Sequence, residues 1–355
     1  MRLLVAISHH GLGHLAQAAP VLNALHAARP DLEFLVWSGL PRAALAARIH
    51  APFTHRHEPA DVGLVMHDAV RVDLDASRAA YRAFHQDWAA RVAREAAWLR
   101  DQGMAGVLAD VACLPLAAAA RAGIPGVALC SLNWVDIVGA YLAEQPGMAR
   151  VLARMAAAYR SARVFLRATP AMAMDWLENR ETLPPIAARG VNRGGELRSR
   201  LGLNDDRLVL IGFGGVNYQA AAVPPPLAGV RWLVPDECLA DRPDVIPFSR
   251  TGLPFIDLLA SSDALITKVG YGSFVEAAAA GLPVLYIDRP DWPETPFLAN
   301  WLLDHANAAA IGEAQLSTPE IGARLAALWR LPPRPPVATP GAERAARRVL
   351  EIVSL

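Results

Sequence analysis

The sequence has 355 residues, 54% of them apolar and 19% charged, which is a globular composition with enough apolar material for two cores. The 34 acidic and 34 basic residues cancel and no basic block occurs, so we do not expect nucleic acid as a partner. Three widely spaced cysteines, Cys113, Cys130 and Cys238, argue against a disulfide framework and for a cytoplasmic protein with reduced thiols.

The apolar segments are short. The run at residues 3–7 is too short for the core of a signal peptide, and no run approaches the roughly 18 residues of a membrane span. We therefore expect a soluble protein, for which only peripheral contact with a membrane is left open.

The first half of the chain repeats one pattern. Residues 2–8 form an apolar run, a loop rich in glycine and histidine follows, and residues 15–30 have apolar positions at helical spacing. The same strand, loop and helix recur from 33, from 106 and from 126, and the strand at 163–168 ends the series. Residues 60–102 form an insertion in which 78–100 are predicted as one long helix. Apolar strands that alternate with helices predict a parallel sheet covered on both faces.

The pattern stops between 169 and 206, where proline and glycine are frequent, and restarts with apolar runs that begin at 207, 230, 245, 264 and 281. Residues 331–341 resemble a rigid spacer before a final helix. We predict an α/β protein with two Rossmann-like, doubly wound domains at 1–188 and 189–335. We expect the C-terminal segment 336–355 to form a helix that packs back on the first domain.

The loops that follow strands are the expected ligand sites in such sheets. In the loop "SHHGLGH" (8–14), Gly11 and Gly13 allow a sharp turn, and His14 opens the next helix. An imidazole there is suited to removing a proton from a hydroxyl group, although His14 could also serve only as a helix cap. The loop lacks the third glycine of the dinucleotide fingerprint.

The second domain has two glycine-rich turns of the same kind. Gly214 and Gly215 follow the strand at 207–211 and suit an anion. Gly270, Gly272 and Ser273 precede the helix "FVEAAAA", so free N–H groups and the positive end of the helix dipole face a ligand there. Glu276 lies one turn further and can accept hydrogen bonds from a ribose.

Lys268, the only lysine of the chain, stands directly before that turn. Its place at the end of an apolar run is unusual for a random surface lysine, and a cation beside a helix N-terminus fits a diphosphate. The alternative is that the ammonium only holds the turn in place.

The run "TKVGYGSFVEAAAAGLPVLYIDRPDWPETPFLANWL" together with "GLGH" near the N-terminus resembles inverting glycosyltransferases of the GT-B fold. It is similar to the peptidoglycan N-acetylglucosaminyltransferase group and to the glycosyltransferase-like N-terminal region of arabinokinases. The resemblance implies a nucleotide-sugar donor bound by the second domain and a hydroxyl-bearing acceptor, not identified by the sequence, bound by the first.

The resemblance also implies roles for single residues. Glu276 matches the ribose-binding glutamate, and Gly272 and Ser273 match the diphosphate-binding turn. Asp291 and Glu294 fall in the loop that reads the hydroxyls of the donor sugar. His14 matches the proposed base, with His10 as the alternative, and Asn133 and Trp134 are candidates for the acceptor pocket.

Retaining members of the fold often carry two glutamates separated by seven residues. Here the second is Glu276 and Lys268 takes the place of the first, so a cation can offset the charge that develops on the leaving diphosphate. We recognise no Asp-x-Asp pair of the kind that holds a donor metal. The expectation is therefore metal-independent inversion without a cofactor.

Two other functions remain open at this stage. A nucleotide-sugar 2-epimerase of the same fold is one, because "DRPDWPETP" is distantly similar to a segment of that family, although its N-terminal Arg-Pro-Glu is missing here. A non-catalytic protein that binds a nucleotide sugar is the other.

Overall fold

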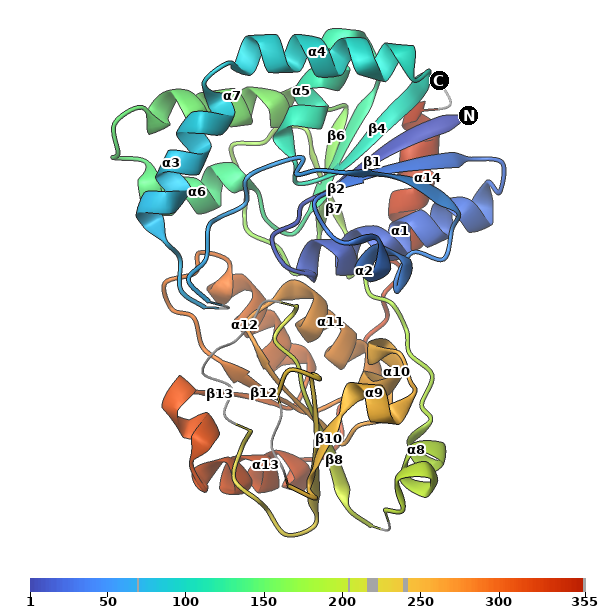
Figure 1. The fold of residues 1–355 in the computed structure, drawn as a ribbon, viewed down its shortest axis with the longest axis vertical. Coiled ribbons are helices and arrows are strands. Elements are labelled where there is room, and N and C mark those ends of the chain that lie inside the picture. Colours follow the sequence, from blue (N-terminus) through green and yellow to red (C-terminus); the bar gives the residue numbers. More distant parts are fainter. Residues whose placement is uncertain (69, 204, 216–222, 239–241, 354–355) are drawn as a thin grey trace. The chain divides into compact units, whose positions relative to one another are not determined.

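The computed structural model describes residues 1–68, 70–203, 205–215, 223–238 and 242–353. Their contacts divide the chain into two compact units (Figure 1). Unit 1 comprises Met1–His67, Arg71–Ile186 and Thr339–Leu355, and unit 2 comprises Asp68–Val70 and Ala187–Ala338.

Unit 1 is built on a parallel sheet of seven strands in the order β3-β2-β1-β4-β5-β6-β7. The strands are β1 Arg2–Ile7, β2 Glu33–Ser38, β3 Phe53–His57, β4 Met104–Asp110, β5 Gly126–Cys130, β6 Val164–Ala168 and β7 Arg180–Leu183. The central strand β1 pairs with β2 on one side and β4 on the other, and its residues from Leu3 to Ile7 are at most 1% exposed. The continuous apolar run is thus explained by burial on both faces.

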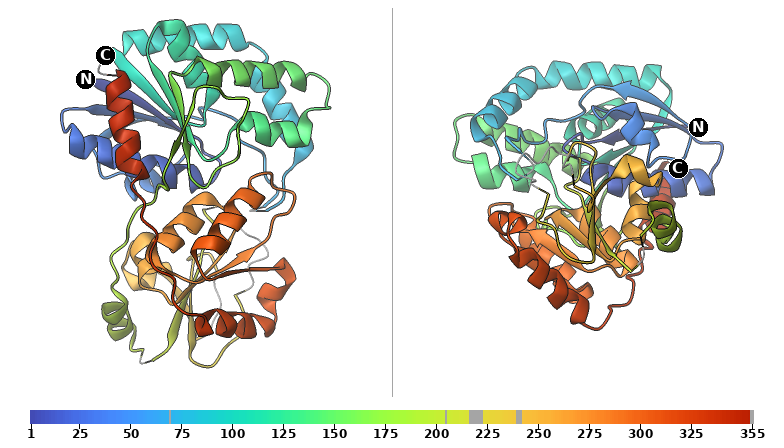
Figure 2. Two further views of the ribbon diagram at one scale, coloured as in Figure 1. Left: turned by 180° about the vertical axis from the view of Figure 1, so that it is seen from behind. Right: turned by 60° about the horizontal axis from the view of Figure 1, so that its bottom comes forward.

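Helices cover both faces of this sheet, as Figure 2 shows from two further sides. They are α1 Gly13–Ala28, α2 Arg42–Ala46, α3 Leu74–His85, α4 Trp88–Asp101, α5 Cys113–Ala122, α6 Trp134–Leu142, α7 Met148–Ser161 and α14 Gly341–Val353. Helix α14, red in Figure 1, packs against α1 at the start of the chain.

Unit 2 has a parallel sheet of six strands in the order β10-β9-β8-β11-β12-β13. The strands are β8 Arg207–Ile211, β9 Val230–Val234, β10 Val245–Pro247, β11 Ala264–Lys268, β12 Val284–Ile287 and β13 Ala308–Ile311. Its helices are α8 Gly194–Leu201, α9 Phe248–Thr251, α10 Phe255–Ala260, α11 Tyr271–Ala280, α12 Thr295–His305, the 3-10 helix η1 Glu313–Ser317 and α13 Glu320–Arg330. Ile321, Leu325 and Leu328 of α13 join the strands in one buried core.

The two sheets confirm the predicted α/β class with two parallel sheets. β3, β7 and β13 are not among the strands predicted from the sequence, and all three are edge strands. An edge strand is paired on one side only, so its sequence need not be a continuous apolar run. "FTHRH" and "RETL" are largely polar, and "AAAI" is not enriched in β-branched residues.

The single long helix predicted at 78–100 is wrong, because the structure has two helices, α3 and α4, with a break at Gln86 and Asp87. Aspartate favours the start of a helix over its interior, and Asp87 lies at the N-cap position of α4. The two helices contact each other across this turn, since the ring of His85, which ends α3, stacks on that of Trp88, which begins α4, with centroids 4.5 Å apart.

After Ile186 the chain enters unit 2, and it returns to unit 1 at Thr339; the segments beside these two points pair with each other within unit 1. Ile186 and Pro340 form an antiparallel bridge, and the N–H of Gly341 donates to the carbonyl of Pro185 at 3.1 Å. A Cβ on Gly341 would lie 2.2 Å from the carbonyl oxygen of Pro184, so only glycine fits. Within the described part of the chain, every helix is too short or too polar to cross a membrane.

Candidate active site

In unit 1 the site lies where β1, β4 and β5 end. Ser8 follows β1, and a turn then brings the chain to α1, with Gly11 in a left-handed conformation (φ +75°) and its N–H bonded to the carbonyl of His9 at 2.8 Å. His14 is the second residue of α1 and is 5% exposed. The predicted turn therefore places this imidazole at the sheet edge where ligands bind in parallel α/β folds.

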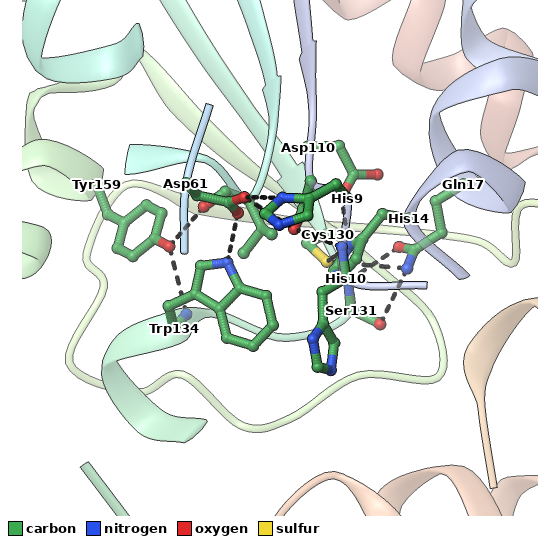
Figure 3. Close-up of polar contacts among 12 residues, drawn as sticks. His9, His10, His14, Gln17, Asp61, Asp110, Cys130, Ser131, Trp134 and Tyr159 are labelled. Atoms are coloured by element: carbon green, nitrogen blue, oxygen red, sulfur yellow. Dashed lines mark hydrogen bonds and ion pairs between the residues drawn. The ribbon is translucent and has the colours of Figure 1, made fainter. Parts of the chain in front are cut away.

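His14 is held by a carboxylate that the sequence analysis did not single out. Nδ1 of His14 lies 2.8 Å from Oδ1 of Asp110, and the aspartate is completely buried at the end of β4 (Figure 3). Burial raises the pKa of Asp110, and the adjacent imidazole opposes that rise. With Nδ1 engaged by Asp110, Nε2 is the nitrogen that can take up a proton.

A second carboxylate, Asp61, lies beside His9. Its oxygens accept from the Ser8 hydroxyl at 3.1 Å and from the Trp134 indole at 2.8 Å, and they lie 3.5 Å from Nδ1 of His9. The pKa of Asp61 is lowered despite its burial, since His9 and His14 favour the carboxylate. His10 is turned to the backbone, with Nδ1 3.1 Å from the carbonyl oxygen of Leu64.

Trp134 joins these groups, because its ring centroid is 5.3 Å from that of His10 and 5.7 Å from that of His14. Trp134 is 1% exposed, so its side chain lies in the interior of unit 1 beside the two histidines. Asn133 is also buried and caps α6 by accepting from the N–H of Asp136 at 2.9 Å. Their role toward an acceptor stays a prediction.

The chain does contain an Asp-x-Asp sequence, at Asp73 and Asp75, in contrast to the expectation from the sequence. Asp73 caps α3 by accepting from the N–H of Ala76 at 2.9 Å, and Asp75 pairs with Arg78 at 3.1 Å. Both carboxylates thus have structural partners on their own helix.

In unit 2 the predicted donor residues lie at or after the ends of β8, β11 and β12. Gly214 and Gly215 follow β8 and both have positive φ (+70° and +74°), a conformation that favours glycine, and their role toward an anion stays a prediction. The rest of that turn lies outside the described residues. Gly270 precedes α11, and Gly272 and Ser273 lie in its first turn, where backbone N–H groups have no partner within the helix.

Glu276 is 3% exposed in the middle of α11. Lys268 is the last residue of β11 and partly buried. Burial and, to a smaller extent, the positive charge of Arg289 lower the pKa of Lys268 to about 7, and Glu294 opposes the shift. The amine is therefore poised near neutral pH, and an anion bound beside it would favour its charged form.

The segment after β12 forms a compact turn that contains the two predicted sugar-reading residues. Asp291 is exposed, whereas Glu294 is 4% exposed and accepts from the Trp292 indole at 3.3 Å. The turn is closed by the Thr295 hydroxyl, which donates to the carbonyl of Arg289 at 2.7 Å. The guanidinium of Arg289 lies 4.6 Å from the centre of the Trp292 ring, and neither residue was singled out from the sequence.

Comparison with known proteins adds to this geometry. No protein-family model matches the sequence. The chain is 27% identical over 308 residues to L-arabinokinase from Arabidopsis thaliana, with 83% of this chain and 29% of that protein covered, so it spans less than a third of this relative. It is 26% identical over 277 residues to an uncharacterized glycosyltransferase from Methanopyrus kandleri, with 71% and 76% covered. The similarity to the peptidoglycan group stays a prediction.

Solved structures show the same architecture. Spinosyn forosaminyltransferase superposes with a TM-score of 0.59 at 15% identity, and all of this chain and 95% of that one are covered. The glycosyltransferase VinC, solved in complex with dTDP, superposes with a TM-score of 0.54 at 18% identity and the same coverage. The chain therefore has the two-unit α/β architecture of the GT-B glycosyltransferases.

Proposed function

We propose that the protein is an inverting, metal-independent glycosyltransferase that moves a sugar from a nucleotide-sugar donor to a hydroxyl group of an acceptor. The observation that carries this proposal is the buried pair of His14 and Asp110, joined at 2.8 Å within a fold shared with glycosyltransferases. The nucleotide in the VinC complex and the similarity to a glycosyltransferase from Methanopyrus kandleri support the choice of donor.

The chemistry follows from the pair. Nε2 of His14 takes the proton of the acceptor hydroxyl, whose oxygen attacks the anomeric carbon on the face opposite the diphosphate. The bond from that carbon to the diphosphate oxygen breaks, its electron pair leaves with the nucleoside diphosphate, and the configuration inverts. Asp110 keeps the proton on Nδ1 and stabilises the imidazolium that forms.

His14 is a better base than His10 on this geometry. His14 has a buried carboxylate on Nδ1, whereas the same atom of His10 lies against the backbone of Leu64. A carboxylate partner orients the imidazole and stabilises its charged form by a full negative charge, whereas a carbonyl partner stabilises that form less.

Unit 2 supplies the groups that stabilise the negative charge of the leaving diphosphate. The N-terminus of α11 stabilises an anion by roughly 0.3 to 2 kcal/mol, and Lys268 adds a cation that offsets the charge on the leaving diphosphate. Glu276 accepts hydrogen bonds from the ribose, and Asp291 and Glu294 bind hydroxyls of the donor sugar.

Incubation with a panel of nucleotide sugars tests this proposal. We expect slow release of a nucleoside diphosphate, which His14→Ala lowers about 10²- to 10⁴-fold while donor binding persists. A sugar converted to its epimer, or binding without any release, contradicts the proposal. Normal release by His14→Ala together with its loss in His10→Ala moves the base to the other histidine.

A further inference from the structure

We propose that His14, Asp110 and Cys130 form a binding site for a thiophilic divalent metal ion such as Zn²⁺, and that the bound ion inhibits the protein. A ring nitrogen of His14, a carboxylate oxygen of Asp110 and Sγ of Cys130 all lie within 4.8 Å of one another. They are grouped in Figure 3, and all three residues are buried. The inhibition rests on the proposed role of His14 as a base, whereas metal binding does not.

The distances suit tetrahedral coordination. Nδ1 of His14 is 3.6 Å from Sγ of Cys130. A zinc ion bound at its usual distances holds a nitrogen and a sulfur ligand about 3.6 Å apart. Nδ1 and Oδ1 of Asp110 are 2.8 Å apart and need to separate by roughly half an ångström, because the ion replaces the proton between them.

The backbone fixes the three donors in advance. Asp110 ends β4 and Cys130 ends the neighbouring strand β5, where the sheet register pairs Asp110 with Leu129. Gln17 on α1 supports this corner, since its Nε2 lies 3.8 Å from Sγ of Cys130 and its Oε1 accepts from the N–H of Ser131 at 3.0 Å. Such support of ligands from behind strengthens metal binding.

The chemistry of the set favours a borderline or soft ion. One imidazole, one thiolate and one carboxylate match Zn²⁺, Co²⁺ or Cd²⁺, while Mg²⁺ and Ca²⁺ prefer oxygen ligands. Binding moves the single imidazole proton of His14 from Nδ1 to Nε2 and releases the thiol proton of Cys130 to solvent, and no electron is transferred. Because Nε2 then carries the proton, the imidazole can no longer accept one from the acceptor hydroxyl.

The test uses Co²⁺ as a spectroscopic probe on the full chain carrying Cys238→Ser, which removes the partly exposed thiol. We expect one equivalent of Co²⁺ to produce a thiolate-to-cobalt charge-transfer band that Zn²⁺ displaces. Cys130→Ser should abolish the band and weaken Zn²⁺ at least about tenfold. Cys113→Ser, which removes another buried thiol, is the matched control and should keep both.

Each other outcome overturns the site. If the band is absent, the ion does not bind through a thiolate. If the band survives in Cys130→Ser, or is lost in a folded Cys113→Ser protein, the ion binds elsewhere. Asp110→Asn provides a second test if Cys130→Ser fails to fold, and it should keep the thiolate band with weaker affinity. Because Co²⁺ is titrated without a nucleotide sugar, a protein that transfers no sugar contradicts the proposed function and leaves the metal result intact.

Discussion

The indole Nε1 of Trp134 donates to Oδ2 of Asp61 at 2.8 Å, and both side chains are buried. Trp134→Phe keeps most of the ring but leaves the carboxylate without this donor. We expect the free energy of unfolding to fall by about 1 to 3 kcal/mol, measured by urea denaturation. Trp37→Phe is the control within the same unit, because among the described residues Nε1 of Trp37 has no hydrogen-bond partner. Equal losses in the two variants would mean that ring size, and not the hydrogen bond, matters.

Asp110→Asn tests the pair that carries the proposed reaction. An asparagine amide donates to Nδ1 of His14, so the proton moves to Nε2 and that nitrogen can no longer act as a base. We expect turnover to fall about 10²- to 10⁴-fold with donor affinity unchanged, measured by steady-state kinetics and calorimetry. Turnover within a factor of two of the unmodified protein would remove Asp110 from the mechanism.

We expect the pH profile of kcat/KM to have an alkaline limb that is set by Lys268. Because burial lowers its pKa to about 7, the ammonium is lost above that pH, and kcat/KM should fall roughly tenfold per pH unit. Lys268→Arg keeps the charge and should retain part of the activity without this limb, while Lys268→Met should lose most of it. A limb that persists in Lys268→Arg belongs to another group.

The same residue predicts how stability depends on pH. The folded-state pKa is below the ordinary value of 10.5, so between about pH 7 and that value the unfolded chain binds more protons than the folded one. This contribution therefore makes stability rise with pH across that window. Lys268→Met should flatten the rise, measured by urea denaturation at several pH values. A steeper rise in the variant would contradict the burial of the amine.

Glu276→Ala should weaken the nucleoside diphosphate by about 1 to 3 kcal/mol, because the ribose loses hydrogen bonds to a buried carboxylate. Calorimetry with uridine, guanosine and thymidine diphosphates measures this loss and also identifies the nucleobase that the donor site prefers. Glu320→Ala, an exposed glutamate in the same unit, is the matched control and should bind normally. Full affinity in Glu276→Ala would remove the residue from the donor site.

The central strands of each sheet can be predicted from the sequence better than the edge strands. Central strands such as β1 and β11 are buried on both faces, so most of their side chains are apolar and the strand is visible as a continuous apolar run. Edge strands carry no such signal, and β7 with "RETL" lies inside the stretch that the sequence analysis assigned to the connection between domains.

The site is predicted in part for a related reason. His14 is visible because a glycine turn surrounds it, and Lys268 is visible because it is the only lysine. Asp110 and Asp61 were missed, since one ends an ordinary apolar strand and the other lies in a loop without a motif. The signal for Asp110 was a charged residue at the carboxyl end of "GVLAD", next to the strand that leads to His14. Which carboxylate meets which histidine depends on packing between strands that are far apart in sequence.

Gly341→Ala should destabilise unit 1 by about 1 to 3 kcal/mol, because the added Cβ meets the carbonyl oxygens of Pro184 and Pro185. Gly139→Ala is the control, since a Cβ there meets nothing within 4 Å and lies inside α6. The control should gain about 0.5 to 1 kcal/mol. Thermal unfolding measures both, and a stable Gly341→Ala protein would show that the paired segments can move apart.

The bridge between Ile186 and Pro340 bears on the order in which the chain folds during synthesis. All of unit 2 is made before α14, whereas α1, made near the beginning, has to wait for α14 as its packing partner. Once residue 338 has emerged from the ribosome, the whole of unit 2 is outside it, while α1 still exposes the surface that α14 later covers. We expect unit 2 to resist protease first on nascent chains, and chaperones that bind apolar surface to be released only after α14 has docked.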